Sequence, residues 1–204
     1  MADLLSALGS DGAEELYTEV VRENLDKRTL IFNDDVNDCL LENYIMYILR
    51  WNREDHDIPV EKRDPITIIC NSGGGDAFAG NSMIDLMLAS ETPINTVCVG
   101  ICASMMYHIF LAGTKRVAFK NSVFLQHDGE VNVKNSTSKA RDTMKFFEEM
   151  ESRTKDYVLS RTTMSPEFYD QKYDNEFWMY ASEAKELGIV TDIVGEDVKL
   201  SDIF

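Results

Sequence analysis

One serine in this sequence stands where its side chain could act as a nucleophile. Ser104 follows Gly100-Ile101-Cys102-Ala103, and we expect it at a turn between a strand and a helix. A serine at such a turn can project its hydroxyl above the strand ends, with the N–H of the next residue, Met105, facing the same space. Taken alone, a serine that caps the helix N-terminus is the simpler interpretation.

A histidine that could serve such a nucleophile as a base comes later in the chain. His127 follows the apolar run Val123-Phe124-Leu125, and strand ends are where a parallel sheet delivers side chains to a common cleft. Of the other histidines, we expect His56 to be solvated in a charged loop and His108 to be packed along the helix that follows Ser104. A single histidine is more commonly a core or surface residue, so His127 needs the other features beside it.

The glycine-rich segment Asn71-Ser72-Gly73-Gly74-Gly75 offers backbone N–H groups. Glycine permits positive φ, and a following helix adds positive dipole, so the segment could hold a phosphate or a developing oxyanion. A phosphate loop needs a nearby cation, and Asp76 counts against that use. A tight turn without any ligand is the third possibility.

A serine–histidine pair also needs a carboxylate that orients the imidazole and stabilises its charged form. The candidates are Asp170, Asp174 and Glu176. Acidic residues are abundant in this chain, and any one of them alone is most simply a solvated charge.

Alternating apolar segments indicate an α/β protein with a largely parallel sheet. The sequence predicts strands at 29–32, 66–70, 94–99, 116–119, 123–125 and 189–194. It predicts helices at 14–26, 36–51, 77–89, 105–112, 139–160, from 166 onward, and 181–187. The large apolar residues on these helices exceed what one small domain hides, which predicts an oligomer; they are Tyr44, Tyr47, Trp51, Phe146, Phe147 and Trp178.

Composition excludes several classes of function. The 204 residues carry a formal charge of −16, which disfavours nucleic acid and anionic membranes. The apolar runs are too short for a membrane span, and the acidic beginning of the chain does not resemble a signal peptide. Cys39, Cys70, Cys98 and Cys102 lie in apolar segments, so we expect reduced core thiols, a cytoplasmic location and no metal site or cofactor.

Taken together, the ordered motifs resemble the ClpP peptidase family, the proteolytic subunit of the Clp protease. Residues 71–75 are similar to its Asn-Ser-Pro-Gly-Gly, and residues 100–105 to its Gly-x-Ala-Ala-Ser-Met. Residues 111–116 and 121–127 resemble the run before its histidine, and residues 181–190 resemble its C-terminal segment. The likeness covers roughly residues 28–195.

The resemblance implies a crotonase-like spiral of ββα units over residues 29–204, with a helical handle at about 129–163 and an axial, gate-like segment at 1–28. It implies that Ser104 is the nucleophile, that His127 is the base, and that the N–H groups of Gly75 and Met105 form an oxyanion hole. Glu176 occupies the place of the family's catalytic aspartate, with Asp174 as the alternative. The family assembles as stacked heptameric rings that work with an AAA+ unfoldase on polypeptide substrates.

The chain also departs from the family. Asp128-Gly129-Glu130 replaces the family's Gln-Pro-x-Gly-Gly after the histidine, and residues 1–11 lack the proline-flanked apolar start of its gate. A serine endopeptidase is therefore the leading hypothesis, and an inactive or weak subunit that co-assembles with active ones is the alternative. An acyl-CoA enzyme on the same spiral is a third hypothesis, which leaves Ser104 and His127 unexplained.

Overall fold

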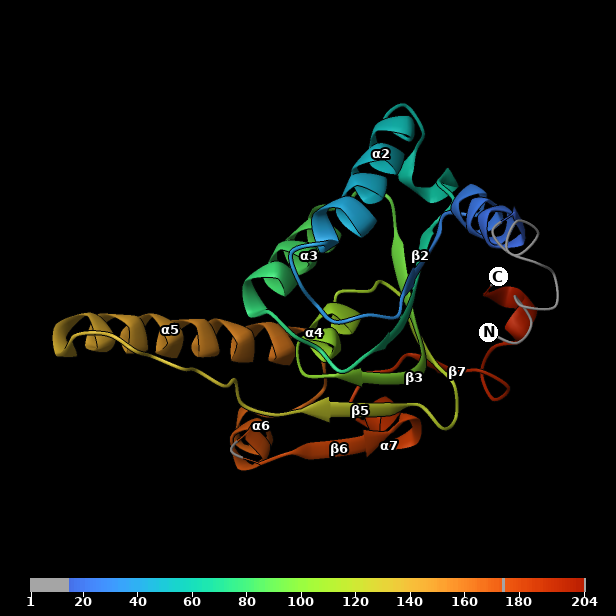
Figure 1. Ribbon diagram of the computed structural model, residues 1–204. Helices are drawn as coiled ribbons and strands as arrows, with labels where there is room; N and C mark the ends of the chain where they lie inside the picture. Colours follow the sequence, from blue (N-terminus) through green and yellow to red (C-terminus); the bar gives the residue numbers. More distant parts are fainter. Residues whose placement is uncertain (1–14, 174, 204) are drawn as a thin grey trace.

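A largely parallel sheet forms the centre of the molecule. The computed structural model describes residues 15–173 and 175–203. Parallel strands run in the order β1-β2-β3-β4-β7, and β5 pairs with β3. Their bounds are β1 Thr29–Phe32, β2 Ile66–Ser72, β3 Ile94–Ala103, β4 Arg116–Ala118, β5 Val123–Gln126 and β7 Asp192–Ile193. The predicted α/β class with a mainly parallel sheet is confirmed (Figure 1).

Strand β3 is longer than the sequence predicted, and this extension builds the site. Its first half pairs with β4 and its second half, from Ile101, pairs with β5. We predicted that the strand ends at Val99, with a turn from Gly100, and this is wrong. Asn71 explains the continuation, because its Oδ1 accepts from the Ile101 N–H at 3.1 Å where the β2–β3 register shifts. A Cβ added to Gly100 would lie 2.3 Å from that oxygen, so glycine permits the contact.

Strand β6 (Phe177–Tyr180) was not predicted at all. It pairs antiparallel with β5, with Phe124 opposite Met179. Its four residues are too short and too uniformly apolar to show the alternation that identifies a half-buried strand. It closes the sheet beside the strand that carries His127.

The helices between the strands mostly match their predicted positions. These are α3 Ala77–Ala89, α4 Met105–Leu111 and α7 Ala181–Glu186. The helix predicted over 36–51 is different, because Val36 forms an isolated bridge with Gly75 and regular helix begins only later. A π-helical segment, η1 (Leu41–Ile45), leads into α2 (Met46–Glu54). Residues 15–26 are helical, and the remainder of the predicted gate segment, residues 1–14, lies outside the described residues.

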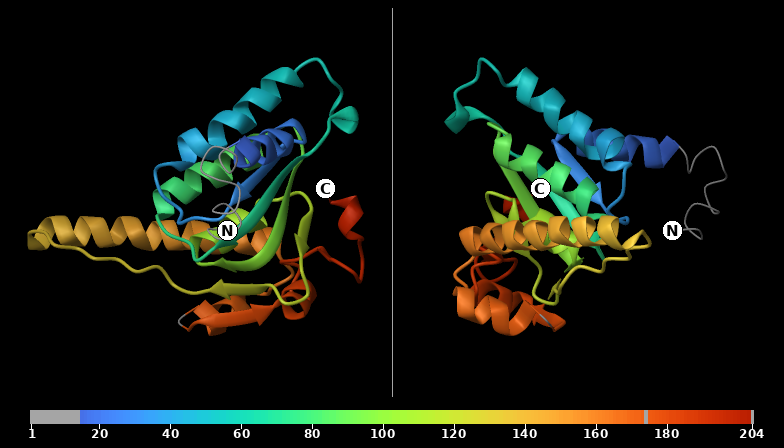
Figure 2. Two further views of the ribbon diagram at one scale, coloured as in Figure 1. Left: turned by 45° about the vertical axis from the view of Figure 1, so that its right-hand side comes forward. Right: turned by 90° about the vertical axis from the view of Figure 1, so that its left-hand side faces the viewer.

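Helix α5 (Thr137–Arg161) projects from the body of the molecule (Figures 1 and 2). Its C-terminal part contacts α4 and the short helix α6 (Pro166–Tyr173). Tyr157 ties it to the body by donating to the backbone oxygen of His108 at 2.9 Å. The C-terminal part of α5 thereby lies beside the turn that carries Ser104.

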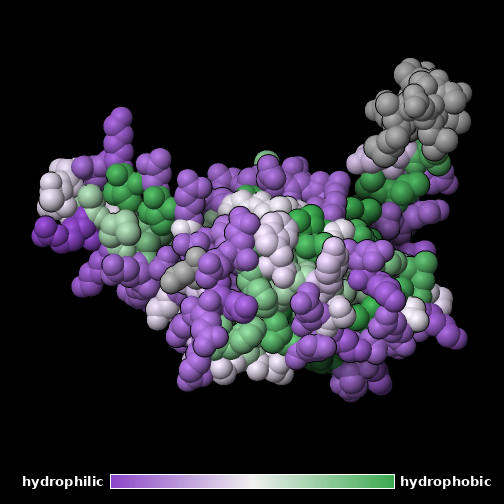
Figure 3. Space-filling model, turned by 90° about the horizontal axis from the view of Figure 1, so that it is seen from below, coloured by the Kyte–Doolittle hydropathy of each residue, from purple (hydrophilic) through white to green (hydrophobic). Residues whose placement is uncertain are grey.

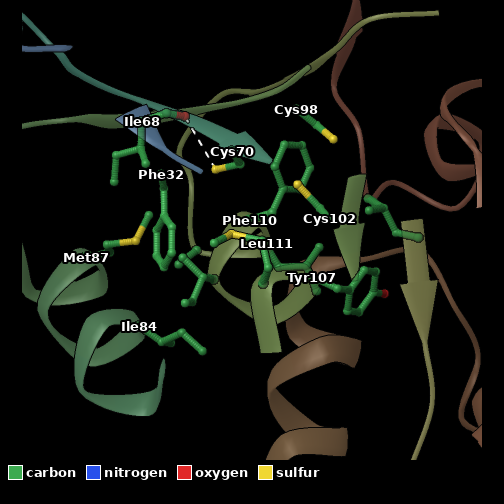
Figure 4. Packing of buried hydrophobic residues seen from close by; sticks show 14 of the residues in the cluster. Phe32, Ile68, Cys70, Ile84, Met87, Cys98, Cys102, Tyr107, Phe110 and Leu111 are labelled. Carbon is green, nitrogen blue, oxygen red and sulfur yellow. Dashed lines mark hydrogen bonds between the residues drawn. The ribbon is translucent and has the colours of Figure 1, made fainter. Parts of the chain in front are cut away.

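The core lies between the sheet and the helices α2, α3 and α4. Phe32, Ile68, Phe110 and Tyr107 are fully buried there, as Figure 4 shows. Buried too are Cys70, Cys98 and Cys102, whereas Cys39 is exposed, contrary to the predicted core position.

Several large apolar side chains reach the surface, but not all those we predicted. Tyr44 and Trp51 are buried in the core, because they lie on the inner face of the helical segment that covers the sheet. Phe146 and Trp178 are exposed, and Phe78 stacks on Phe146. Figure 3 shows apolar side chains at the surface of the projecting part of the molecule, which consists of α5 and the segment that leads into it. Within the described ranges, no helix combines the length and the apolar character that crossing a membrane requires.

Candidate active site

Ser104 has an unusual backbone conformation. Its φ is 53° and its ψ is −125°, and it directly precedes α4. These angles resemble the first central position of a type II′ turn, which glycine normally occupies. The side chain makes no capping hydrogen bond, so the simpler interpretation of Ser104 as an ordinary helix cap does not describe it. A non-glycine residue held in this region stores roughly 1–3 kcal/mol of strain, and such residues cluster at functional sites.

The strand register brings the two other predicted segments to either side of Ser104. On one side Ser72 of β2 is opposite Cys102, and on the other Leu125 of β5 is opposite Ala103. Because all three strands are parallel, their carboxyl ends meet at one edge. The glycine segment therefore leaves β2, and His127 leaves β5, beside the turn that carries Ser104.

A buried hydrogen bond holds the ends of α4 and β5 together. Tyr107 donates to Oε1 of Gln126 at 3.1 Å, and both side chains are buried. Gln126 immediately precedes His127, and Ser104 donates its backbone N–H to the Leu125 oxygen at 2.9 Å. These bonds fix the backbone of the nucleophile candidate relative to that of the base candidate.

The glycine segment is shaped by its bridge to Val36. The backbone N–H of Val36 donates to the Gly74 oxygen at 2.9 Å, and the backbone N–H of Asp76 donates to the Val36 oxygen at 2.8 Å. In a parallel bridge of this kind the central residue, Gly75, directs its own N–H away from Val36. Gly75 and Met105 both line the pocket that Ser104 lines. An oxyanion hole is built from such backbone N–H groups, so these two residues are its candidates at this pocket.

The pocket has a volume of about 440 Å³ and gathers most of the predicted site. Ser104, Met105, Gly75 and His127 all line it. Ser104 and His127 make no hydrogen bond to each other in the part of the chain that the structure describes. Catalytic hydrogen bonds are commonly long or poorly aligned before substrate binds. A serine and a histidine that line one pocket can therefore still form the hydrogen bond that catalysis needs when substrate is present.

His108 also lines this pocket, which we did not predict. Burial, and then the charge of the nearby His127, lower the pKa of His108 to about 4. The sequence did hold a signal for it, because residues i and i+4 of a helix share one face. His108 therefore lies on the same face of α4 as the Ser104 turn, as a neutral imidazole.

The described carboxylates that we predicted as a third catalytic residue do not line the pocket that Ser104 and His127 share. Glu176 accepts a hydrogen bond from the Trp178 indole at 2.9 Å and does not line the pocket. Asp170 pairs with Lys155 at 2.6 Å. Asp174 lies outside the described residues. Across residues 15–173 and 175–203, no group of three or more His, Cys, Asp or Glu side chains is arranged to hold a metal ion.

Comparisons with known proteins point in one direction. A family model described as Clp protease matches residues 12–197 of the chain. A curated protein from Bacillus cereus, named ATP-dependent Clp protease proteolytic subunit 1, is 28% identical over 182 residues, which cover 88% of this chain and 89% of that protein. The solved structure of a ClpP1 mutant from Listeria monocytogenes superposes with a TM-score of 0.74 at 26% identity, over 86% of this chain and 95% of that one.

Proposed function

Because the chain belongs to the Clp protease family, we propose that it is a serine endopeptidase subunit that cleaves unfolded polypeptides through an acyl-enzyme. The observation that carries the proposal is the strained Ser104, which shares one pocket with His127, Gly75 and Met105. Glycine would adopt the backbone angles of Ser104 without strain, so packing alone does not explain a serine at this turn. The strain is understandable if the hydroxyl must face a substrate.

The mechanism uses only groups of this chain and water. His127 accepts the proton of the Ser104 hydroxyl as the oxygen attacks the peptide carbonyl carbon. The resulting oxyanion accepts hydrogen bonds from the N–H groups of Gly75 and Met105, each worth roughly 3–4 kcal/mol of barrier. The C–N bond then breaks, and His127 returns the proton to the leaving amine. Water, deprotonated by His127, hydrolyses the ester and regenerates Ser104.

Glu176 is the third member that we propose for the triad, with Asp174 as the alternative. A glutamate can orient a histidine as an aspartate does, as in hydrolases with a Ser-His-Glu triad. For Glu176 to reach His127, its carboxylate must leave the Trp178 indole, which holds it at 2.9 Å. Glu176 directly precedes β6 and His127 directly follows β5, and Phe177 is opposite Gln126, so a side-chain rotation is the smallest change that could bring Glu176 and His127 together.

The decisive experiment is covalent labelling of Ser104. A fluorophosphonate should modify the wild-type chain once, as measured by intact mass, and peptide mapping should place the adduct on Ser104. Ser104→Ala should show no adduct and no peptide hydrolysis. Undiminished labelling of Ser104→Ala would reject Ser104 as the nucleophile.

A second candidate function is a catalytically weak or inactive subunit that co-assembles with active subunits. The observation that favours it is the hydrogen bond that keeps Glu176 on Trp178 and outside the pocket. The same labelling experiment distinguishes the two functions. An assembled sample in which the fluorophosphonate leaves Ser104 unmodified supports the inactive subunit.

Assembly and partners are part of the proposal. We expect stacked heptameric rings, in which neighbouring copies cover the exposed apolar side chains of α5 and β6, such as Phe146 and Trp178. The curated relative's name includes ATP dependence, and an AAA+ unfoldase is the partner class that we propose here. Light scattering at physiological salt should give the mass of a ring assembly, and a monomeric mass would contradict this.

A further inference from the structure

One wall of the active-site pocket carries a carboxylate that the proposed mechanism does not use. Phe147, Met150, Glu151 and Thr154 are spaced along one face of α5, and all four line the pocket that contains Ser104. Glu151 is half-buried there. The pocket wall thus combines apolar surface with a single partly desolvated negative charge.

Groups from two other elements surround Glu151. Burial, and then the neighbouring carboxylates of Glu151 and Asp128, raise the pKa of Tyr173 to about 12. Glu151 on α5 and Asp128 after β5 therefore both lie close to Tyr173 on α6, although the sequence separates all three. Glu151 therefore shares its side of the pocket with a tyrosine hydroxyl and a second carboxylate.

The carboxylates that line the pocket give it a negative charge. Its acidic lining residues are Asp76, Asp128, Glu130 and Glu151, and no lysine or arginine of the described ranges lines it. Asp76 is already used, because its Oδ1 accepts the Ala79 N–H at the start of α3. Asp128 and Glu130 are exposed at the rim, so water screens them more than it screens Glu151.

An apolar wall that also carries a carboxylate matches one kind of substrate side chain. Lysine and arginine place an apolar stem against apolar surface and a cationic head beside an acid. A purely aliphatic side chain would fill the same wall but would supply no cation to the partly desolvated Glu151 carboxylate, whose hydrogen-bonding neighbour is the Tyr173 hydroxyl. An acidic side chain would add like-charge repulsion.

We propose that Glu151 is a specificity-determining residue, which selects polypeptides with a lysine or arginine side chain next to the bond that Ser104 cleaves. The inference rests on the proposed function, because it assumes that Ser104 is the nucleophile. It names the substrate class that the protease takes at this pocket.

The test uses two peptidyl diphenyl phosphonates that differ only in the side chain next to the reactive phosphorus, which is lysine in one and norleucine in the other. Norleucine keeps most of the apolar stem and lacks the ammonium group. The assembled wild-type protein should react at least fivefold faster with the lysine probe. Glu151→Gln should bring the ratio close to one, and Glu151→Lys should reverse it.

Asp156→Asn is the matched control, because Asp156 is exposed on the opposite face of the same helix and its substitution changes the net charge equally. This variant should keep the wild-type ratio. A wild-type ratio of one or below, or a Glu151→Gln variant that keeps the preference, overturns the inference.

A small alkyl fluorophosphonate, which carries no peptide side chain, separates this inference from the proposed function. If it modifies Ser104 but neither peptidyl phosphonate reacts, the pocket does not take such side chains and the inference is overturned while the serine hydrolase stands. If Ser104 is not modified by any probe, the proposed function fails, and the specificity fails with it.

Discussion

Gly74 and Ser104 are in such close contact that a Cβ atom added to Gly74 would lie 2.7 Å from the Cβ of Ser104. Gly74 also has a φ of 102°, where other residues are strained. We predict that Gly74→Ala displaces the Ser104 turn and lowers the rate of fluorophosphonate labelling at least tenfold. The free energy of unfolding should fall by roughly 1–3 kcal/mol, from overpacking and backbone strain. Labelling kinetics and denaturant unfolding measure the two effects.

Gly73 supplies the control for this prediction. It is the neighbouring residue in the same segment, and a Cβ added to it would meet no atom within 4 Å. Gly73→Ala should therefore label at nearly the wild-type rate. Equal losses in the two variants would mean that glycine content, rather than the contact with Ser104, sets the activity of this segment.

The strained backbone of Ser104 should lower the free energy of unfolding, and catalysis nevertheless requires a serine at this position. With φ at 53°, a glycine at this position relieves strain that an alanine keeps. We predict that Ser104→Gly and Ser104→Ala both abolish labelling, and that the glycine variant is more stable by about 1 kcal/mol. Thermal unfolding of the two variants side by side measures this difference. If Ser104→Ala is the more stable of the two, the backbone strain at this turn is not significant.

The sequence predicted the parallel strands that flank this site, although it ended β3 too early, and it missed the features that depend on side-chain direction. The β-branched run from Ile66 and the apolar run before His127 predicted the strands, and parallel pairing then brought Ser104 and His127 to one edge. The short β6 was missed because its pairing with β5 is a tertiary contact that local pattern does not record. The Glu176 carboxylate is turned by the Trp178 indole, two residues along the same segment, which alignment to a family motif could not show.

The partly buried imidazole of His108, which lines the pocket, should make stability depend on pH. Its pKa is about 4 in the folded protein against 6.5 for the free side chain, so the unfolded chain binds the extra proton between these values. The stability that this group contributes is present above pH 6.5 and is lost as the pH falls toward 4. When the pH is lowered from 7 to 5, the free energy of unfolding should fall in both proteins. We predict that it falls by roughly 2 kcal/mol less in His108→Phe than in the wild type. Urea unfolding at both pH values checks this.

His56 is the comparison residue for the pH experiment, because it is an exposed histidine away from the pocket. His56→Gln should reproduce the wild-type pH dependence. If His108→Phe does so as well, the proton uptake lies elsewhere in the protein.

The ion pair between Arg28 and Asp55 should be a major contribution to stability. Both guanidinium nitrogens donate to the carboxylate, at 2.6 and 2.7 Å, and Thr92 donates to it at 2.8 Å. Asp55 is only 1% exposed, so Asp55→Asn leaves the Arg28 charge poorly compensated. We predict a loss of about 2–3 kcal/mol, measured by denaturant unfolding.

Acid should remove the same contribution in the wild type. The hydrogen bond from Arg28 is the largest cause that lowers the pKa of Asp55 below 3.8. The stability is therefore present above pH 3.8 and is lost as the pH falls below it. The difference between wild type and Asp55→Asn should shrink in that range. Glu54→Gln breaks the exposed pair with Arg50 and removes the smallest of the charge interactions that act on Arg28, so it should shift the melting temperature little at any pH.

The hydrogen bond from Trp178 to Glu176 should restrain catalysis if Glu176 orients His127. Trp178→Phe keeps the aromatic ring on β6 but removes the indole N–H, which frees the carboxylate to turn toward the pocket. We predict that Trp178→Phe raises the rate of peptide hydrolysis at least twofold, and that Glu176→Gln lowers it by roughly two orders of magnitude or more. The double variant should be as slow as Glu176→Gln alone, because the indole acts only through the carboxylate. An unchanged rate in Glu176→Gln would exclude this residue from the triad and leave Asp174, whose substitution by asparagine should then give the loss.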